Sequence, residues 1–238
     1  MNTYRIFTAV AASLMFVTTI HAASMESIEA RVGFGTSPDA QGFTGFFENG
    51  FVQGSPSHTD TVSYSDGTVQ VDLNITVEGF DENLAPSGIR TTAAAVGVEG
   101  AGDTGFESTR LDTGEFITVT FNDINFSVIG VPPSGHAVDP TSFEVLISTI
   151  QLAAFDSGLD TFTYTGVGAS AVTGDDTNVL TFIPSQEVVD GDSFTILADS
   201  GAFRGLFVSL SANYATIPEP ASLGLMCLAL LTYSVRRR

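Results

Sequence analysis

The stretch TVQVDLNITV, residues 68–77, decides the fold class of this chain of 238 residues. Apolar and polar side chains alternate through it without interruption. Successive side chains of a β-strand point to opposite faces, so a period of two predicts a strand with one buried and one solvent-facing side. The apolar members are Val69, Val71, Leu73, Ile75 and Val77.

Moving outward, the same pattern returns in FITVTF, residues 116–121, and then slips by one position at Asn122 and Asp123. The alternation resumes at Ile124, and such a slip indicates a β-bulge or a tight turn. Further short strands are predicted around residues 62–64, 94–98, 143–147, 162–164, 179–183, 194–196 and 206–214.

Turn sequences separate these segments, and no segment between the two ends has a helical period of 3.6. The turns are Asp66-Gly67, Pro86-Ser87-Gly88, Pro132-Pro133-Ser134-Gly135 and Asp190-Gly191. Many short strands with such punctuation predict an all-β fold, an antiparallel β-sandwich or jelly roll. One domain over residues 24–216 is expected, and residues 131–140 are the only candidate seam.

The charge of the chain is strongly negative, with 8 Lys and Arg against 27 Asp and Glu, and a formal net charge of −19. Phosphate backbones and anionic lipid headgroups would repel such a protein, which argues against nucleic acid as a partner, whereas divalent cations would be attracted. Apolar residues make up 43% of the chain, too many for a disordered acidic tail. The single cysteine, Cys227, lies near the C-terminus, so the body has no thiol nucleophile and no disulfide.

The N-terminal segment, residues 1–23, has the order of a secretory signal peptide. Arg5 supplies positive charge, residues 6–20 are uncharged and mostly apolar, and the small residues Ala22 and Ala23 follow. We expect a signal helix that is cleaved after Ala22 or Ala23. The alternative is an uncleaved membrane anchor.

The C-terminal segment, residues 217–238, contains a run without charge at 221–235. As a helix this run would be about 22 Å long, which is short against a bilayer core of about 30 Å. Pro218 and Pro220 directly precede the run and set the start of the helix, because proline does not fit inside a helix. The terminal arginines stay in the cytoplasm by the positive-inside rule. The segment therefore predicts a short hydrophobic helix that anchors the protein only transiently in the inner membrane, with a plain permanent anchor as the alternative.

The order of three elements in this segment resembles the PEP-CTERM sorting signal. These are Pro218-Glu219-Pro220, the apolar run, and Arg236-Arg237-Arg238. The resemblance implies export in a Gram-negative bacterium that makes extracellular polysaccharide. It also implies recognition and cleavage near the Pro-Glu-Pro by a membrane exosortase. It covers only the tail, which is an address and carries no activity.

No catalytic constellation is apparent in the body, and we expect no enzymatic activity. His58 and His136 are the histidines outside the signal peptide, both in polar surroundings that suggest solvated loops, and no Gly-x-Ser-x-Gly elbow occurs. Tryptophan, a frequent platform for sugar rings, is absent. The short Thr-x-Thr runs, such as Thr118 with Thr120, look like ordinary strand composition.

A calcium site is the metal hypothesis that the sequence offers. Calcium prefers six to eight oxygen ligands, several of them from one loop. The candidate ligands are Glu99, Asp103, Asp112 and Glu115, among glycines in residues 98–115. Solvated acidic turns are the alternative interpretation.

These observations predict an exported structural or adhesive protein of the cell surface or the extracellular matrix, with an exosortase-type enzyme as a partner and exopolysaccharide as a further candidate. The competing class is a carbohydrate-binding module assisted by calcium. A third class is a secreted hydrolase that uses scattered carboxylates.

Overall fold

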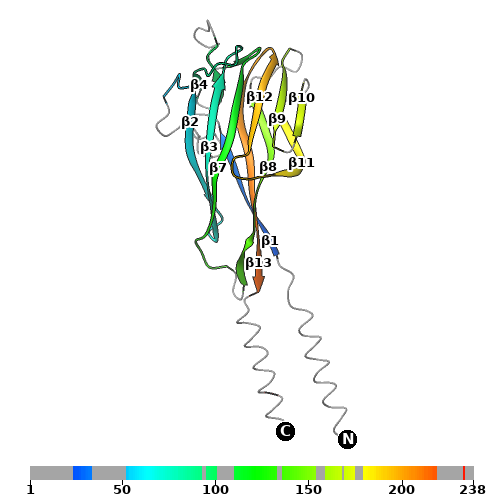
Figure 1. The fold of residues 1–238 in the computed structure, drawn as a ribbon. Helices are drawn as coiled ribbons and strands as arrows, with labels where there is room; N and C mark the ends of the chain where they lie inside the picture. The colour runs from blue at the N-terminus through cyan, green and yellow to red at the C-terminus, as the bar shows by residue number, and fades with distance from the viewer. Residues whose placement is uncertain are drawn as a thin grey trace.

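The computed structural model describes residues 24–33, 52–92, 95–100, 110–132, 136–153, 159–167, 169–174, 179–218 and 233. This part of the chain forms strands that build two antiparallel sheets (Figure 1). The expected signal helix, and the expected C-terminal helix apart from Tyr233, lie outside the described residues. Among the residues that are described, no helix is both long and apolar enough to cross a membrane.

The first sheet is built around β13, the last strand. Its path runs in the order β11 (Val179–Val188), β8 (His136–Ala153), β13 (Ala202–Pro218), β5 (Val96–Val98) and β4 (Ile89–Thr91). Two further strands, β1 (Ser24–Gly33) and β6 (Leu111–Asp112), also pair with β13. The strand β13 is long enough to have different neighbours along its length.

The second sheet contains the stretch from which the sequence analysis began. Its order is β10 (Ala169–Gly174), β9 (Thr161–Gly166), β12 (Ser193–Ser200), β7 (Phe116–Val128), β3 (Val69–Phe80) and β2 (Ser57–Ser65). Every pairing in both sheets is antiparallel. The prediction of an all-β antiparallel fold is therefore confirmed.

One hydrophobic core lies between the buried faces of the two sheets. The five apolar residues of the opening stretch are at most 1% exposed, and they share the core with Ile147, Val208 and Leu210 of the first sheet. Aromatic rings fill the space beside them, with Phe121 and Tyr164 at centroid distances of 6.0 and 5.7 Å from Phe194. Burial on one face of each sheet explains the period of two and gives a sandwich-like arrangement.

The slip in the pattern of β7 is a β-bulge. Asp72 of β3 pairs with Asn125, whereas Asn74 pairs with Asn122, so β7 has one residue more than β3 between these pairs. Asp123 takes up the extra length with a positive φ of 51°, a conformation that Asp tolerates better than most residues. The side-chain amide of Asn74 donates to Asp123 Oδ2 at 2.7 Å.

The sequence-based expectation missed β1, β4, β6 and the first part of β8 in the first sheet, and β10 in the second. The strand β8 begins at His136, so residues 136–140 of the candidate seam are strand. Pro140 is tolerated there because it lies where the register between β8 and β13 shifts. The strand β1 was not anticipated, since its residues lack a clean alternation.

Candidate functional site

The residues that lead into the Pro-Glu-Pro motif belong to β13 and are held in the first sheet. Ala215 pairs with Met25 of β1 on one side and with Asp139 of β8 on the other. Thr216 is likewise paired on both sides, with Ser24 as its β1 neighbour. The pairing with β8 continues to Pro218, the last residue of β13. The folded body therefore reaches the first residue of the motif without a spacer.

Side chains reinforce this end of β13. The hydroxyls of Ser24 and Thr216 form a hydrogen bond of 2.7 Å, and Thr216 is only 2% exposed. The amide of Ala215 donates to Ser142 Oγ at 2.7 Å. Burial ends abruptly one residue later, since Ile217 is 36% exposed. Figure 1 shows the start of β1 beside the end of β13.

A hydrogen bond between the sheets connects this region to the turn between β2 and β3. The hydroxyl of Tyr214 donates to Asp66 Oδ2 at 2.6 Å. Partial burial alone would raise the pKa of Asp66, but hydrogen bonds from Tyr214 and from the amides of Val69 and Thr68 hold it below its ordinary value. Burial, followed by the bond to Asp66, raises the pKa of Tyr214 to about 12. The carboxylate of Asp66 is thus kept ionised by a donor from the other sheet.

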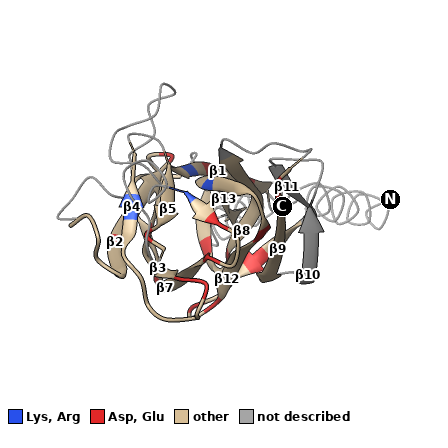
Figure 2. Cartoon of the chain, turned by 90° about the horizontal axis from the view of Figure 1, so that it is seen from above, with Lys and Arg blue, Asp and Glu red and all other residues tan. Residues whose placement is uncertain are grey.

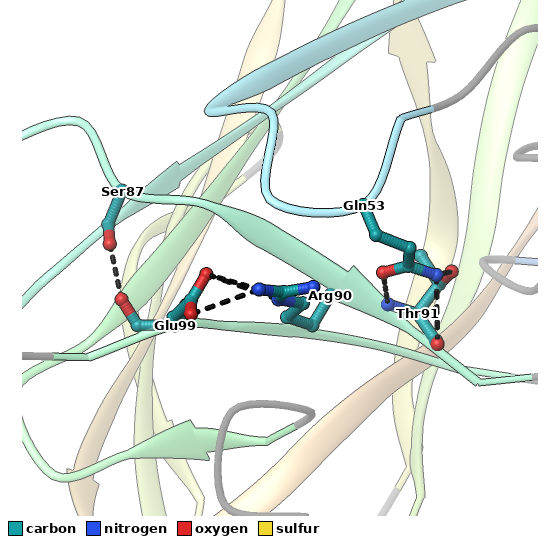
Figure 3. A network of polar contacts seen from close by, with 5 residues as sticks. All are labelled: Gln53, Ser87, Arg90, Thr91 and Glu99. Carbon is teal, nitrogen blue, oxygen red and sulfur yellow. Dashed lines mark hydrogen bonds and ion pairs between the residues drawn. The ribbon is translucent and has the colours of Figure 1, made fainter. Parts of the chain in front are cut away.

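The first candidate calcium ligand, Glu99, is engaged by an arginine. Its carboxylate accepts two hydrogen bonds from Arg90 of β4, at 3.0 and 3.1 Å, and its backbone carbonyl accepts one from the Ser87 hydroxyl (Figure 3). Next to this pair, Gln53 donates to Thr91 Oγ1 at 2.7 Å and accepts from the Thr91 amide. These contacts fasten the loop before β2 to the hairpin of β4 and β5.

The remaining candidate ligands are not brought to Glu99 by the described residues. Glu115 is 2% exposed, and its carboxylate accepts a hydrogen bond of 2.8 Å from the amide of Asp112, which closes the turn between β6 and β7. Asp103 lies outside the described residues. Within the described ranges, no group of three or more His, Cys, Asp or Glu side chains could hold a metal ion. The calcium site stays a prediction.

The charges of the described residues are distributed rather than gathered at one site. Acidic residues occur on several strands and turns of both sheets, while the arginines lie on β1, β4 and β13 and next to β6 (Figure 2). The two histidines are in strands rather than in loops, contrary to the expectation. His58 belongs to β2, and His136 is the first residue of β8.

The outer face of the second sheet carries cross-strand rows of hydroxyls. One row consists of Thr59, Thr76, Thr120 and Ser193, contributed by β2, β3, β7 and β12. A neighbouring row places Thr118 beside Thr195, whose hydroxyls are 3.0 Å apart, and Thr195 beside Thr165. The Thr-x-Thr runs of β7 and β9 are therefore connected through Thr195 of β12, the strand that lies between them.

The outer face of the first sheet has a shallow cavity of about 320 Å³. It lies over β1, β8, β13 and β11, and most of the residues that line it are polar. The lining includes Ser27, Glu29, Arg31, Ser185, Ser209 and Ser211. One cation, one anion and several hydroxyls thus surround a half-open hollow.

The comparisons with known proteins identify the tail and leave the body unassigned. The family model of the PEP-CTERM protein-sorting motif matches residues 216–238. No curated protein and no solved structure gives a significant match to the chain. The motif implies export, transient membrane anchoring and processing by an exosortase-type enzyme, and the resemblance that the sequence showed is confirmed.

Sequence reasoning found the tail but missed how the body is joined to it. The matched segment begins at Thr216, so its first three residues are also the last three of β13. Glu219, Pro220 and the three terminal arginines lie outside the described residues. The only signal in the sequence was the continuation of the β13 alternation to Tyr214 and the small number of residues between Tyr214 and Pro218.

Proposed function

We propose that this protein is an exported, non-enzymatic structural or adhesive component of the cell surface or the extracellular matrix. The body is an acidic all-β domain, and the tail delivers it, anchors it transiently in the inner membrane and is processed by an exosortase-type enzyme. The observation that carries the proposal is the match to the PEP-CTERM sorting motif at residues 216–238.

The outer faces of the two sheets support an adhesive role. Hydroxyls on an exposed sheet face offer both donors and acceptors, which suit the hydroxyl groups of a polysaccharide. The rows on the second sheet present them at the regular spacing of neighbouring strands, about 4.8 Å. A polymer could contact several strands at once, so many weak contacts would add together.

A localisation experiment tests the proposal. The full chain is expressed in cells with and without the exosortase-type enzyme, and the inner-membrane, surface and medium fractions are analysed. We expect a shortened protein at the surface or in the matrix when the enzyme is present, and accumulation in the inner membrane when it is absent. Replacement of Arg236, Arg237 and Arg238 by alanine is the matched variant, and it should abolish the difference. A full-length cytosolic protein in both strains would refute the proposal.

The second candidate is a carbohydrate-binding module assisted by calcium, and the cavity on the first sheet favours it. A hollow lined by serines beside Glu29 and Arg31 has the polar groups that orient a sugar. Binding to a glycan array, with calcium and with chelator, tests this function. If the cavity is the site, Ser209→Ala with Ser211→Ala should weaken binding while Thr76→Val with Thr120→Val does not. A blank array would remove this candidate and leave the structural role.

A further inference from the structure

The place where the sheet ends relative to the sorting motif has a consequence for processing. Backbone groups that are hydrogen bonded within a sheet are not available to a protease, which binds extended and unpaired chain. At Ala215 and Thr216 the strand β13 has a neighbour on each side, whereas at Ile217 and Pro218 the pairing given by the described residues is with β8 alone. The protection of the chain therefore decreases between Thr216 and Pro218.

The strand β1 determines where the two-sided pairing stops. Its first residue, Ser24, pairs with Thr216, and the hydroxyls of the two residues are 2.7 Å apart. The expected signal cleavage after Ala22 or Ala23 leaves this strand at the new N-terminus. A strand that begins at Ser24 covers β13 up to Thr216 and no further.

We propose that β1 sets the position at which the tail is removed. The pairing of β1 and β8 with β13 excludes the bonds up to Thr216 from the processing enzyme, and the pairing with β8 continues to Pro218. The cut therefore falls at or after the bond between Pro218 and Glu219. Ser24 to Ser27 of β1 are positioning residues for this cut, because they act through β13 and touch no reacting atom. The proposal rests on the processing of the tail that is part of the proposed function.

The competing possibility is that the enzyme opens the end of β13 before it cuts. Local opening of strand ends has a small free energy in many proteins, so the pairing alone does not decide the matter. The burial of this end of β13 argues against easy opening, since Tyr214, Ala215 and Thr216 are only 3%, 6% and 2% exposed. Opening would also break the Ala215 bond to Ser142.

The test uses a variant that weakens only the first part of β1. Glu26→Pro with Ser27→Pro removes two adjacent amides, and because alternate residues of an edge strand face the neighbouring strand, one of these amides faces β13. Ile28 and Val32, the buried residues of β1, are left intact. The matched control, Glu26→Ala with Ser27→Ala, changes the same side chains and keeps both amides.

Two measurements follow, one with and one without the processing enzyme. In full-length protein purified in detergent from cells that lack the enzyme, amide exchange is measured for Tyr214 and Thr216, since the amide of Ala215 is bonded to Ser142. We expect strong protection in the wild type and in the alanine control, and exchange about tenfold faster in the proline variant. In cells with the enzyme, mass spectrometry of the mature protein gives the C-terminal residue.

The wild type and the alanine control should end at Pro218 or later, whereas the proline variant should also end upstream of Thr216. A C-terminal residue before Pro218 in the wild type would overturn the inference and leave the sorting role intact. Identical ends in all three proteins, despite lost protection in the proline variant, would overturn it as well. No cut in any of them would instead remove the sorting role, and the exchange data would still report whether β1 protects the end of β13.

Discussion

The hydrogen bond from Tyr214 to Asp66 should make the stability of the body dependent on pH in the acid range. Tyr214 is 3% exposed and its hydroxyl lies 2.6 Å from Asp66 Oδ2, so Tyr214→Phe removes a donor to a carboxylate. A hydrogen bond to a charged group contributes about 1.5–3 kcal/mol. Because Asp66 itself is exposed and water can replace the donor, we expect a loss of about 1 kcal/mol at pH 7.

The sign of the pH dependence follows from the depressed pKa of Asp66. A carboxyl with a lower pKa in the folded protein contributes stability above its unfolded value of 3.8, and the contribution disappears as the pH falls through the folded pKa. Phenylalanine at position 214 moves the folded pKa back toward 3.8. The difference in stability between wild type and variant should therefore shrink as the pH falls from about 5 to about 2.

Thermal unfolding of the purified protein at pH 7, 5 and 3 measures the effect, with a shift of about 2–4 °C expected at pH 7. Tyr164→Phe is the matched control, because the Tyr164 hydroxyl donates to the uncharged carbonyl of Val167 at 3.0 Å. Its loss should be about 1 kcal/mol and equal at each pH. An equal loss at pH 7 and pH 3 for the Tyr214 variant would refute the electrostatic argument.

Three further outcomes are expected from other parts of the fold. Gly130→Ala should destabilise the body by about 3 kcal/mol or more, because the added Cβ would lie 1.9 Å from the Gly67 carbonyl oxygen. Gly33→Ala, which has open space around the added Cβ, should not, and urea unfolding compares the two variants. Leu84→Asn should stabilise by about 0.5–1 kcal/mol, since Leu84 has a φ of 61° and an exposed side chain, and an unchanged or lower melting temperature would contradict this. If calcium is a structural ion, its removal by chelator should lower the melting temperature, and Glu99→Gln should reduce that difference; an unchanged midpoint would eliminate the site.

The sequence predicted the strands with a clear alternation, including the edge strands β2 and β11, and missed β1, β4, β6 and β10. The strand β3 could be predicted from the sequence because every second side chain reaches the core. The strand β1 could not, because only Ile28 and Val32 are buried while its first four residues are exposed. The start of β8 lies in the proline-rich stretch that was the candidate seam, and only the register with β13 shows that it is strand.

The tail and the candidate metal site show the same contrast between local and long-range information. The sorting motif is a linear signal, so its residues could be found in order along the chain. The ion pair of Glu99 with Arg90 depends on the hairpin of β4 and β5, and no spacing rule in the sequence predicts which acidic residue pairs with an arginine. The register that places Thr216 beside Ser24 is likewise a property of the completely folded sheet.

The adjacency of the first and last strands also constrains when the body can fold. Ser24 and Thr216 are 192 positions apart, and their contact is among the most non-local that a chain of this length can make. Chains dominated by such contacts fold slowly, because a long loop must close before the contact forms. The first sheet cannot be completed until β13 has left the translocation channel, so the exported body stays incompletely folded until its sorting tail reaches the membrane.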